Sequence, residues 1–425
     1  MAASADDRVG VWLIGAWGGV ATTAAVGLAS LQQGLVGETA LVSALPQFAD
    51  LELIGWDRLV VGGHEIRRSS YAAAARELLE NSRVLDAGQL EAIGPRLAEF
   101  DANVKPGTLI NVGSKIESLA DDCAKGNLGE SPATAIARIK DDLAEFKKRN
   151  KLRHVIVVNL SSTEPPLGLE DVPESWDELA GRLDVADAAS VGSEAGSFRH
   201  GDLAASPLPA STVYAIAAIQ AGCSFVNFTP SVGTNLPAVC ELAEREGALH
   251  VGRDGKTGET LLKSVLAPMF AARNLKVLSW VGHNIFGNLD AVVLDDPVNK
   301  ANKVRSKDHL LTEILGYRPQ TLVSIEYIES MGDWKTAWDH IHFDGFLGTK
   351  MTLQFTWQGC DSLLAAPLVL DLVRFTEREQ RRGGSGVMTQ LSSFFKSPMG
   401  ENVPPEFHRQ YALLEAWAAD VRKET

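Results

Sequence analysis

The chain lacks an excess of basic residues. Its 425 residues include 40 Lys and Arg against 54 Asp and Glu, which gives a formal net charge of −14. A protein whose main role is to bind DNA, RNA or anionic lipid uses surplus Lys and Arg to contact phosphates. The charge balance therefore argues against nucleic acid or a membrane surface as the partner. With 45% hydrophobic and 22% charged residues, the chain is typical of a globular protein of about two domains.

Cysteine is also scarce, and several common motifs are missing. Four cysteines are spread along the chain without a CxxC pair or zinc-ligand spacing. Free thiols are therefore expected. The leading MAASADDR has acids where a secretory signal has basic residues, so the cytoplasm is the expected location. No GxSxG, HExxH or Walker A motif occurs in the sequence.

One long uncharged segment, from Val9 to Gly37, allows two interpretations. Its part from Gly10 to Leu31 is long enough to cross a bilayer. However, its centre reads GAWGG, and Lys and Arg are not distributed asymmetrically around it. A short apolar run, a glycine turn and a helix-length segment indicate the strand–loop–helix start of a buried βαβ unit. We prefer this second interpretation.

Strands and helices alternate through residue 250, which predicts a doubly wound parallel sheet. The expected strands are residues 9–14, 59–61, 108–112, 154–160 and 224–228. The expected helices are residues 20–31, 69–81, 131–150 and 211–221, with loops over 162–208. The character changes near residue 261, where segments 275–280, 321–327 and 352–357 alternate in the manner of antiparallel strands. Residues 361–375 are predicted to form a buried helix that returns to the first domain.

The glycine loop GAWGGVATT has two possible roles. Glycines permit a tight turn and the close approach of a pyrophosphate to helix N–H groups. Here Gly15, Gly18 and Gly19 are present, but Trp17 occupies the position of the second glycine in the dinucleotide fingerprint. The loop alone is compatible with a cofactor site or with a plain structural turn.

An acidic residue that binds the ribose of a dinucleotide is expected about 20 residues after such a loop. Glu38 lies near that distance, whereas Glu65, after Gly62-Gly63, is better placed at a strand end. Arg67 and Arg68 follow and leave NADP open as the coenzyme; alternatively, they begin a solvated helix.

Several lysines are candidates for phosphate or oxyanion binding. Lys303 and Lys307 are four residues apart and would share one helix face, a pairing that suits phosphate or a developing oxyanion. Lys335 and Lys396 are isolated cations in apolar or Gly-rich surroundings, and a buried lysine can act as an acid or base. Solvated surface lysines are the alternative in each case.

Two further motifs remain ambiguous. The turn DGKTGET precedes a helix expected near Leu261 and could hold an anion or simply cap the helix. His340 and His342 would place both rings on one face of a strand, which is a possible metal pair without a nearby third ligand.

Taken together, these motifs resemble the myo-inositol-1-phosphate synthase family, and most closely its shorter prokaryotic and archaeal form. The resemblance runs from Val11 to about Trp417. The matching segments are DGKTGETLLKSVLAPMF, SWVGHNIFGNLDA, SKDHLLTEILGY, GDWKTAW, FLGTKM, CDSLLAAPLVLDL and FFKSPM.

The resemblance implies an NAD site. The family loop GxGGxxG corresponds here to Gly15-Ala16-Trp17-Gly18-Gly19-Val20-Ala21, and the family GGWDI places Glu65 at its NAD-binding aspartate. The family TANTE and NGSPQNT segments become Leu160–Glu164 and Asn227–Ser231, and both depart from the family pattern. The remaining residues implied to bind the cofactor are Ser161, Ser162, Thr163, Thr229, Asp254, Thr257, Asp333, Asp361 and Ser362.

The resemblance also implies the catalytic set, because all four family lysines are present. They are Lys303, Lys307, Lys335 and Lys396, and the further residues implied to bind substrate are Asn284, Asn288 and Asp290. The family reaction oxidises C5 of glucose 6-phosphate, closes the ring by enolisation and aldol attack on C1, and reduces C5 again with the same NAD. Ammonium groups would stabilise the oxygens that become negative. Lys303 would handle the C5 hydroxyl proton, and Lys396 the C5 oxygen of the enolate. Lys307 and Lys335 would act at the phosphate and the C1 oxygen.

The implied fold is an α/β Rossmann-type doubly wound parallel sheet with an inserted α+β domain for catalysis and tetramer contacts. The expected boundaries are 1–260, 261–364 and 365–425, the last segment returning to the Rossmann domain. A homotetramer and an assisting cation, divalent or monovalent, are further expectations. The alternatives are a related cyclitol-phosphate synthase acting on another sugar phosphate, such as fructose 6-phosphate, and an NAD-sensing protein without enzyme activity.

Overall fold

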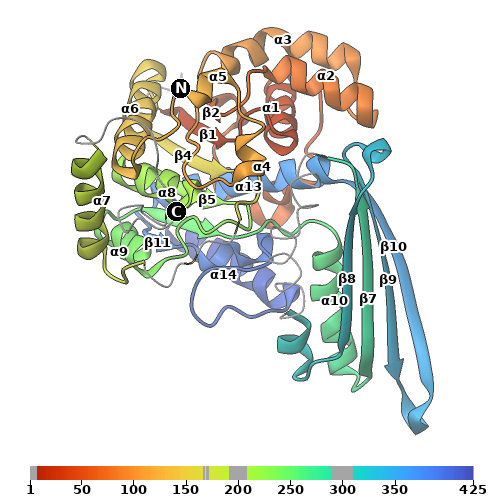
Figure 1. The fold of residues 1–425 in the computed structure, drawn as a ribbon. Helices are drawn as coiled ribbons and strands as arrows, with labels where there is room; N and C mark the ends of the chain where they lie inside the picture. Colours follow the sequence, from red (N-terminus) through yellow and green to blue (C-terminus); the bar gives the residue numbers. More distant parts are fainter. Residues whose placement is uncertain (1–6, 166–167, 169–171, 191–207, 289–309, 425) are drawn as a thin grey trace.

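A computed structural model describes residues 7–165, 168, 172–190, 208–288 and 310–424. These residues form two β-sheets, one of seven strands and one of four (Figure 1). In the described part of the chain, no helix combines the length and the apolar character that a bilayer span requires. The uncharged segment after Arg8 forms a strand, a glycine turn and a helix, which confirms the preferred interpretation of that segment.

The first sheet is parallel and has the strand order β11-β6-β5-β4-β1-β2-β3. Its strands are β1 (Val9–Ile14), β2 (Leu59–Glu65), β3 (Val104–Pro106), β4 (His154–Asn159), β5 (Ser224–Asn227), β6 (Leu249–Gly252) and β11 (Gly386–Val387). The first six strands follow the Rossmann order 3-2-1-4-5-6, which places a ligand crevice at the carboxyl ends of β1 and β4. The predicted doubly wound sheet is confirmed.

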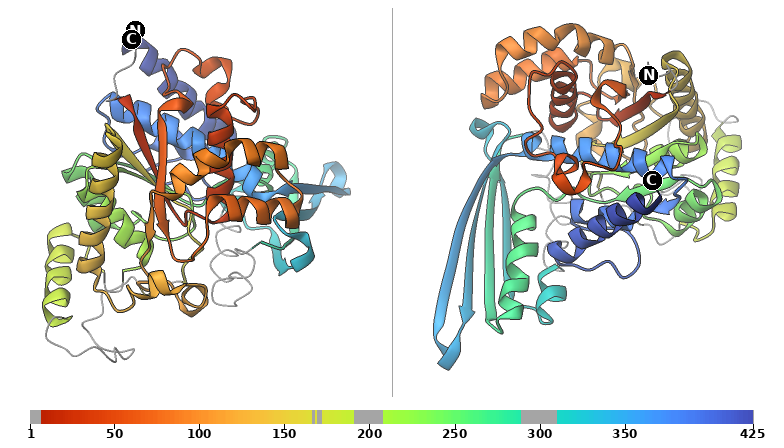
Figure 2. Two further views of the ribbon diagram at one scale, coloured as in Figure 1. Left: turned by 90° about the horizontal axis from the view of Figure 1, so that it is seen from above. Right: turned by 180° about the vertical axis from the view of Figure 1, so that it is seen from behind.

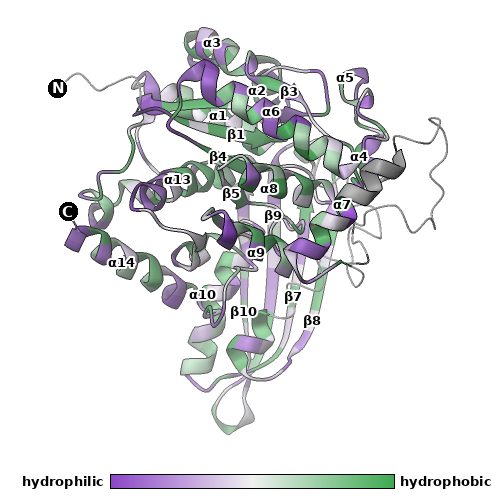
Figure 3. Cartoon of the chain, turned by 90° about the vertical axis from the view of Figure 1, so that its left-hand side faces the viewer, coloured by the Kyte–Doolittle hydropathy of each residue, from purple (hydrophilic) through white to green (hydrophobic). Residues whose placement is uncertain are grey.

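Both faces of this sheet are buried, as its nearly continuous apolar strands require. In β1, Val11 and Leu13 pack into one core while Trp12 and Ile14 pack into the other. The first core includes residues of α1 (Gly19–Gln32), α2 (Tyr71–Ser82), α3 (Ala87–Asp101), α13 (Asp361–Arg381) and α14 (Phe407–Glu424). The second includes residues of α6 (Pro132–Asn150), α7 (Trp176–Ser190), α8 (Ala210–Gln220) and α9 (Pro237–Arg245). Figure 2 shows these helices on both sides of the sheet. In Figure 3, β5 and α8 are mainly hydrophobic, whereas α3 and α14 carry hydrophilic stretches.

The second sheet has the order β10-β9-β7-β8 and extends away from the first (Figure 1). Its strands are β7 (Lys276–Phe286), β8 (Gln320–Tyr327), β9 (Trp334–Asp344) and β10 (Lys350–Cys360). Helix α10 (Glu259–Ala272) covers one face through a core that contains Phe270 and Trp280. Helix α13 begins directly after β10 and packs beside α1, so the chain returns to the first sheet. The exact domain boundaries at residues 260 and 364 stay predictions.

Three expected features of secondary structure are wrong. The stretch 162–208, expected to hold loops, contains helix α7. Residues 108–112 form a loop, and the strand lies earlier, at β3. The loop has its own constraints, since Thr108 N donates to the Tyr214 hydroxyl and Asn111 has a φ of +49°. Strand β8 pairs with β7 in parallel, although its alternation had suggested an antiparallel strand. Alternation of apolar and polar residues indicates that one face of a strand is covered. It does not indicate whether the neighbouring strand runs parallel or antiparallel. Two short helices, α4 (Ser114–Glu117) and α5 (Asp122–Lys125), follow the loop.

Candidate active site

A cavity of about 900 Å³ lies at the carboxyl ends of the first sheet, where the second sheet meets it. Nineteen of the predicted site residues line it: Gly15, Trp17, Gly18, Gly19, Val20, Glu65, Ser161, Ser162, Thr163, Thr229, Asp254, Thr257, Asn284, Asn288, Asp333, Lys335, Asp361, Ser362 and Lys396. Ala16 is fully buried beneath the glycine loop and does not line the cavity. The predicted Asp290, Lys303 and Lys307 lie outside the described residues.

The glycine loop forms a tight cradle at the start of α1. Gly15 has a φ of +78°, and a Cβ there would lie 3.1 Å from Ser161 Cα. A Cβ on Gly19 would lie 2.7 Å from Ser362 Oγ. Among the described residues, no side chain caps α1 and its first turn holds no acid. Its free N–H groups and the positive end of its dipole can therefore hold a pyrophosphate, so the loop fits a dinucleotide.

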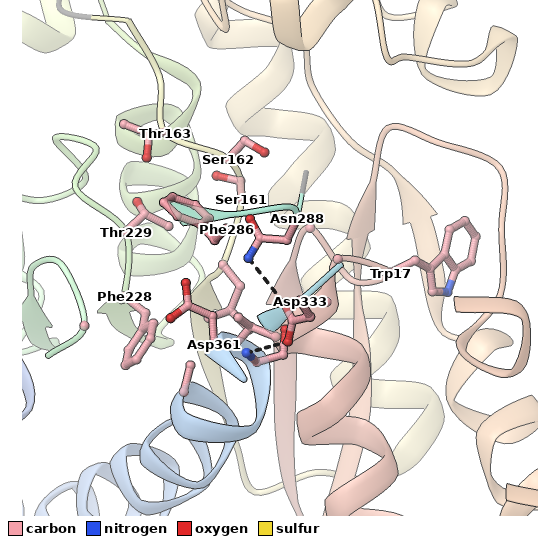
Figure 4. Close-up of a pocket in the computed structure, with 18 of the residues that line it drawn as sticks. Trp17, Ser161, Ser162, Thr163, Phe228, Thr229, Phe286, Asn288, Asp333 and Asp361 are labelled. Carbon is pink, nitrogen blue, oxygen red and sulfur yellow. Dashed lines mark hydrogen bonds between the residues drawn. The ribbon is translucent and has the colours of Figure 1, made fainter. Parts of the chain in front are cut away.

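Trp17 does not obstruct this cradle. Its indole points away from the other labelled residues of the cavity (Figure 4), and Nε1 donates to Asp101 Oδ1 at 2.8 Å. The same Asp101 oxygen accepts from Tyr71 N at 2.9 Å. Trp17, which replaces the second glycine of the fingerprint, thus anchors the loop to α2 and α3. Its indole is directed away from the cradle.

Glu65, rather than Glu38, is placed to meet a ribose. Glu65 ends β2, is 4% exposed and lines the cavity. Its Oε2 accepts from Trp17 N and its Oε1 from Ile66 N, both at 2.9 Å. Glu38 instead accepts from the partly buried Trp56 indole at 2.8 Å and is absent from the cavity lining.

Asp333 organises the junction of the two sheets. Its Oδ2 accepts from Ser362 N and Cys360 Sγ, both at 2.8 Å, and its Oδ1 accepts from Asn288 Nδ2 at 3.2 Å (Figure 4). Burial raises the pKa of the Asp333 carboxyl, and the hydrogen bonds oppose that shift. Asp361 N donates to the Asp333 carbonyl oxygen at 3.0 Å, which places the start of α13 in the cavity wall.

Two of the predicted lysines face this cavity with carboxylate partners. Lys396 Nζ lies 2.7 Å from Asp254 Oδ1, and Lys335 Nζ lies 3.8 Å from Asp361 Oδ2. Lys335 Nζ also lies 4.9 Å from the centre of the Phe286 ring. The two lysine side chains are only 20% and 22% exposed, so neither is a solvated surface lysine. Cations in this setting can stabilise a developing oxyanion or transfer a proton.

Asn284 presents an unsatisfied amide to the cavity. The residue is 1% exposed, and neither its Oδ1 nor its Nδ2 has a hydrogen-bond partner within the described part of the chain. A buried polar group without a partner costs about 1–3 kcal/mol, so such a group in a cavity wall indicates a ligand position. The amide can both donate to and accept from a hydroxyl group.

Two buried ionisable side chains in or near the cavity were not selected as site residues from the sequence. Glu164 lines the cavity, where burial raises the pKa of its carboxyl to about 7 although Ser211 donates to it. Burial, followed by the nearby Lys396, lowers the pKa of the Lys256 ammonium to about 7. Each lies within a quoted motif, Glu164 at the last letter of the TANTE-like segment and Lys256 in DGKTG. Burial is the feature that marks these two side chains as candidates, and the sequence motifs do not show it.

Neither the histidine pair nor the cysteines belong to a group of potential metal ligands among the described residues. His340 and His342 lie on β9, and the described residues include no group of three or more His, Cys, Asp or Glu side chains placed to share a metal ion. All four cysteines are free.

The strand order, the uncapped glycine cradle and Glu65 together define a Rossmann-type dinucleotide-binding protein with a second domain over its crevice. A family model described as myo-inositol-1-phosphate synthase matches residues 9–419. The chain belongs to this family of NAD-binding enzymes.

Individual relatives agree with this assignment. The chain is 32% identical to inositol-3-phosphate synthase 1 of Bacteroides thetaiotaomicron, over 97% of this chain and 94% of that protein. The solved inositol-3-phosphate synthase of Caenorhabditis elegans matches with a TM-score of 0.82 at 23% identity, over 98% of this chain and 86% of that chain. A myo-inositol-1-phosphate synthase-related protein of Thermotoga maritima matches with a TM-score of 0.74 at 22% identity, over 97% and 98% of the two chains. The two structures support the fold.

Proposed function

We propose that the protein converts D-glucose 6-phosphate to 1D-myo-inositol 3-phosphate, also named 1L-myo-inositol 1-phosphate, with NAD as a regenerated cofactor. The observation that carries the proposal is the meeting, in one cavity, of the dinucleotide cradle, two carboxylate-paired lysines and the unsatisfied amide of Asn284. An isomerase that uses internal oxidation and reduction needs this combination of a coenzyme site and oxyanion-stabilising cations.

The N–H groups at the start of α1 would hold the pyrophosphate of NAD, and Glu65 would hold the adenosine ribose. Ser161, Ser162, Thr163 and Thr229 follow β4 and β5, on the other side of the crevice, and would line the nicotinamide half. When bound there, NAD would accept and return the hydride, so that the overall reaction is an isomerisation.

The lysines would act on the oxygens of the sugar. Lys396 would stabilise the C5 oxygen as it becomes negative, with Asp254 holding the ammonium in position at 2.7 Å. Lys335 would act at the phosphate or the C1 oxygen, and Asn284 would bind a sugar hydroxyl. Lys303 and Lys307 complete the proposed set with Asp290, and an assisting cation remains part of the proposal.

The direct test is incubation of the purified protein with NAD⁺ and glucose 6-phosphate, followed by detection of inositol phosphate by mass spectrometry. We expect product without net accumulation of NADH. Product from fructose 6-phosphate alone would favour the related cyclitol-phosphate synthase, for which the altered segment at Phe228, a cavity residue, leaves room. NAD binding without any product from either hexose phosphate would favour the NAD-sensing protein.

We also propose a homotetramer, in the cytoplasm, with the second sheet as the contact. α10 covers one face of this sheet, while the opposite face carries the exposed apolar side chains of Leu322 and Trp338. The β9–β10 turn exposes 87% of Phe346 and 86% of Leu347. Exposed apolar groups of this kind mark protein–protein contacts, and β10 is an uncovered edge strand. The free cysteines are in keeping with a reducing compartment.

The double variant L322E/W338E tests the assembly. Two buried, unpaired carboxylates in a contact would dissociate the subunits. Light scattering should therefore show a smaller species than for the wild type. The control L128E changes an exposed leucine of the first domain, which is 47% exposed, and should leave the mass unchanged. A wild-type protein that is monomeric at micromolar concentration would contradict the proposal.

A further inference from the structure

The residue that is placed to bind the ribose is also paired with an arginine. Arg67 Nη2 lies 3.4 Å from Glu65 Oε2, and Arg67 N donates to Glu65 Oε1 at 3.2 Å. The same Nη2 donates to the Trp17 carbonyl oxygen at 2.9 Å. The guanidinium thus spans the gap between the end of β2 and the glycine loop, and all three residues line the cavity.

These two charges have opposite consequences for coenzyme choice. In Rossmann domains an acid after β2 binds the ribose 2′-hydroxyl of NAD, whereas a nearby arginine accommodates the 2′-phosphate of NADP. Here both residues line the cavity and their charged groups are 3.4 Å apart, so both charges act on the same part of it. A carboxylate at this position repels a 2′-phosphate and at the same time neutralises the cation that would bind it.

Glu65 also occupies the backbone donors at this place. Its two oxygens accept from the N–H groups of Trp17, Ile66 and Arg67. Several N–H groups that converge on one point form an anion site, and the carboxylate of Glu65 fills it in this chain. Without that carboxylate, the same N–H groups and Arg67 would converge on an external anion.

We propose that Glu65 determines the selectivity for NAD over NADP by holding Arg67 and the surrounding N–H groups, and that the chain contains a latent 2′-phosphate site beneath it. This inference rests on the proposed function only in taking NAD as the coenzyme. Of the two arginines that left NADP open in the sequence, it assigns Arg67 as the group that would bind the 2′-phosphate once Glu65 no longer holds it.

The test compares the binding of NAD⁺ and NADP⁺ to the wild type, E65S, R67A and E65S/R67A by isothermal titration calorimetry without sugar phosphate. We expect E65S to weaken NAD⁺ and to bind NADP⁺ at least about tenfold more tightly than the wild type does. The double variant should lose that gain, because Arg67 supplies it. R67A alone should not improve NADP⁺ binding. Melting temperatures near the wild-type value would show that each variant is folded.

Two results would overturn the inference: a folded E65S that gains no NADP⁺ affinity, or a gain that persists in E65S/R67A. The proposed function fails separately. If the wild type binds NAD⁺ and E65S gains NADP⁺ affinity as expected, but the wild type forms no inositol phosphate, only the sugar-phosphate reaction is refuted.

Discussion

Replacing Lys396 with alanine is expected to lower kcat by about 10²–10³-fold, the usual effect of removing one group that stabilises an oxyanion. The ammonium lies 2.7 Å from Asp254 and lines the cavity, whereas the cradle at the start of α1 is built from other residues. The affinity for NAD⁺ should therefore stay near the wild-type value. The rate of inositol phosphate formation and calorimetric titration with NAD⁺ measure the two quantities.

The matched control is K148A, an exposed lysine near the end of α6 that does not line the site cavity. Because α6 leads into the start of β4, this lysine lies at the opposite end of the sheet from the cavity. It should retain full activity. Near-normal turnover in K396A, with K148A also active, would remove Lys396 from the proposed set of catalytic groups.

Replacing Lys263 with methionine is expected to lower the free energy of unfolding by about 3–5 kcal/mol, because it breaks a buried ion pair and leaves carboxylate charge without this partner. Lys263 Nζ lies 2.5 Å from Glu259 Oε1 and 3.8 Å from Asp339 Oδ1, and these three side chains are at most 2% exposed. Trp280 Nε1 donates to the same Asp339 oxygen at 2.6 Å, so the cluster joins α10 to the second sheet.

Urea unfolding measures this change, and K276M supplies the control. Lys276 begins β7 and is exposed, so its replacement should change stability by no more than about 0.5 kcal/mol. Equal stability of K263M and K276M would mean that the ion pair contributes no net stabilisation to the packing of α10 on the second sheet.

Features set by local patterning could be predicted from the sequence. The apolar run before GAWGG, and the helix-length segment after it, correspond to β1 and α1. These two predictions succeeded because strands, helices and glycine turns follow from side-chain periodicity and backbone freedom within a few residues. Lys335 and Lys396 were selected by the family resemblance; both line the cavity, and their catalytic roles stay predictions.

Features that depend on distant partners could not be predicted. The Trp17 indole lies outside the cradle, where Asp101, 84 positions away in the chain, accepts its hydrogen bond. Residues 108–112 have the composition of a strand, but they form a loop in which Thr108 N donates a hydrogen bond to the hydroxyl of Tyr214, 106 positions away. The Asn284 amide lacks a hydrogen-bond partner among the described residues. This depends on all the residues that surround it, so no single segment of the sequence predicts it.

The return of α13 to the first sheet sets an order of events during synthesis. The cradle, β2 and β6 are complete within the first 252 residues, yet Asp361, Ser362 and Lys396 close the cavity from the last sixth of the chain. At about 5–20 residues per second, the ribosome takes roughly 7–30 seconds to make the chain between Gly252 and Lys396. The nascent protein can therefore build its sheet early, but it acquires a closed coenzyme site only as translation ends.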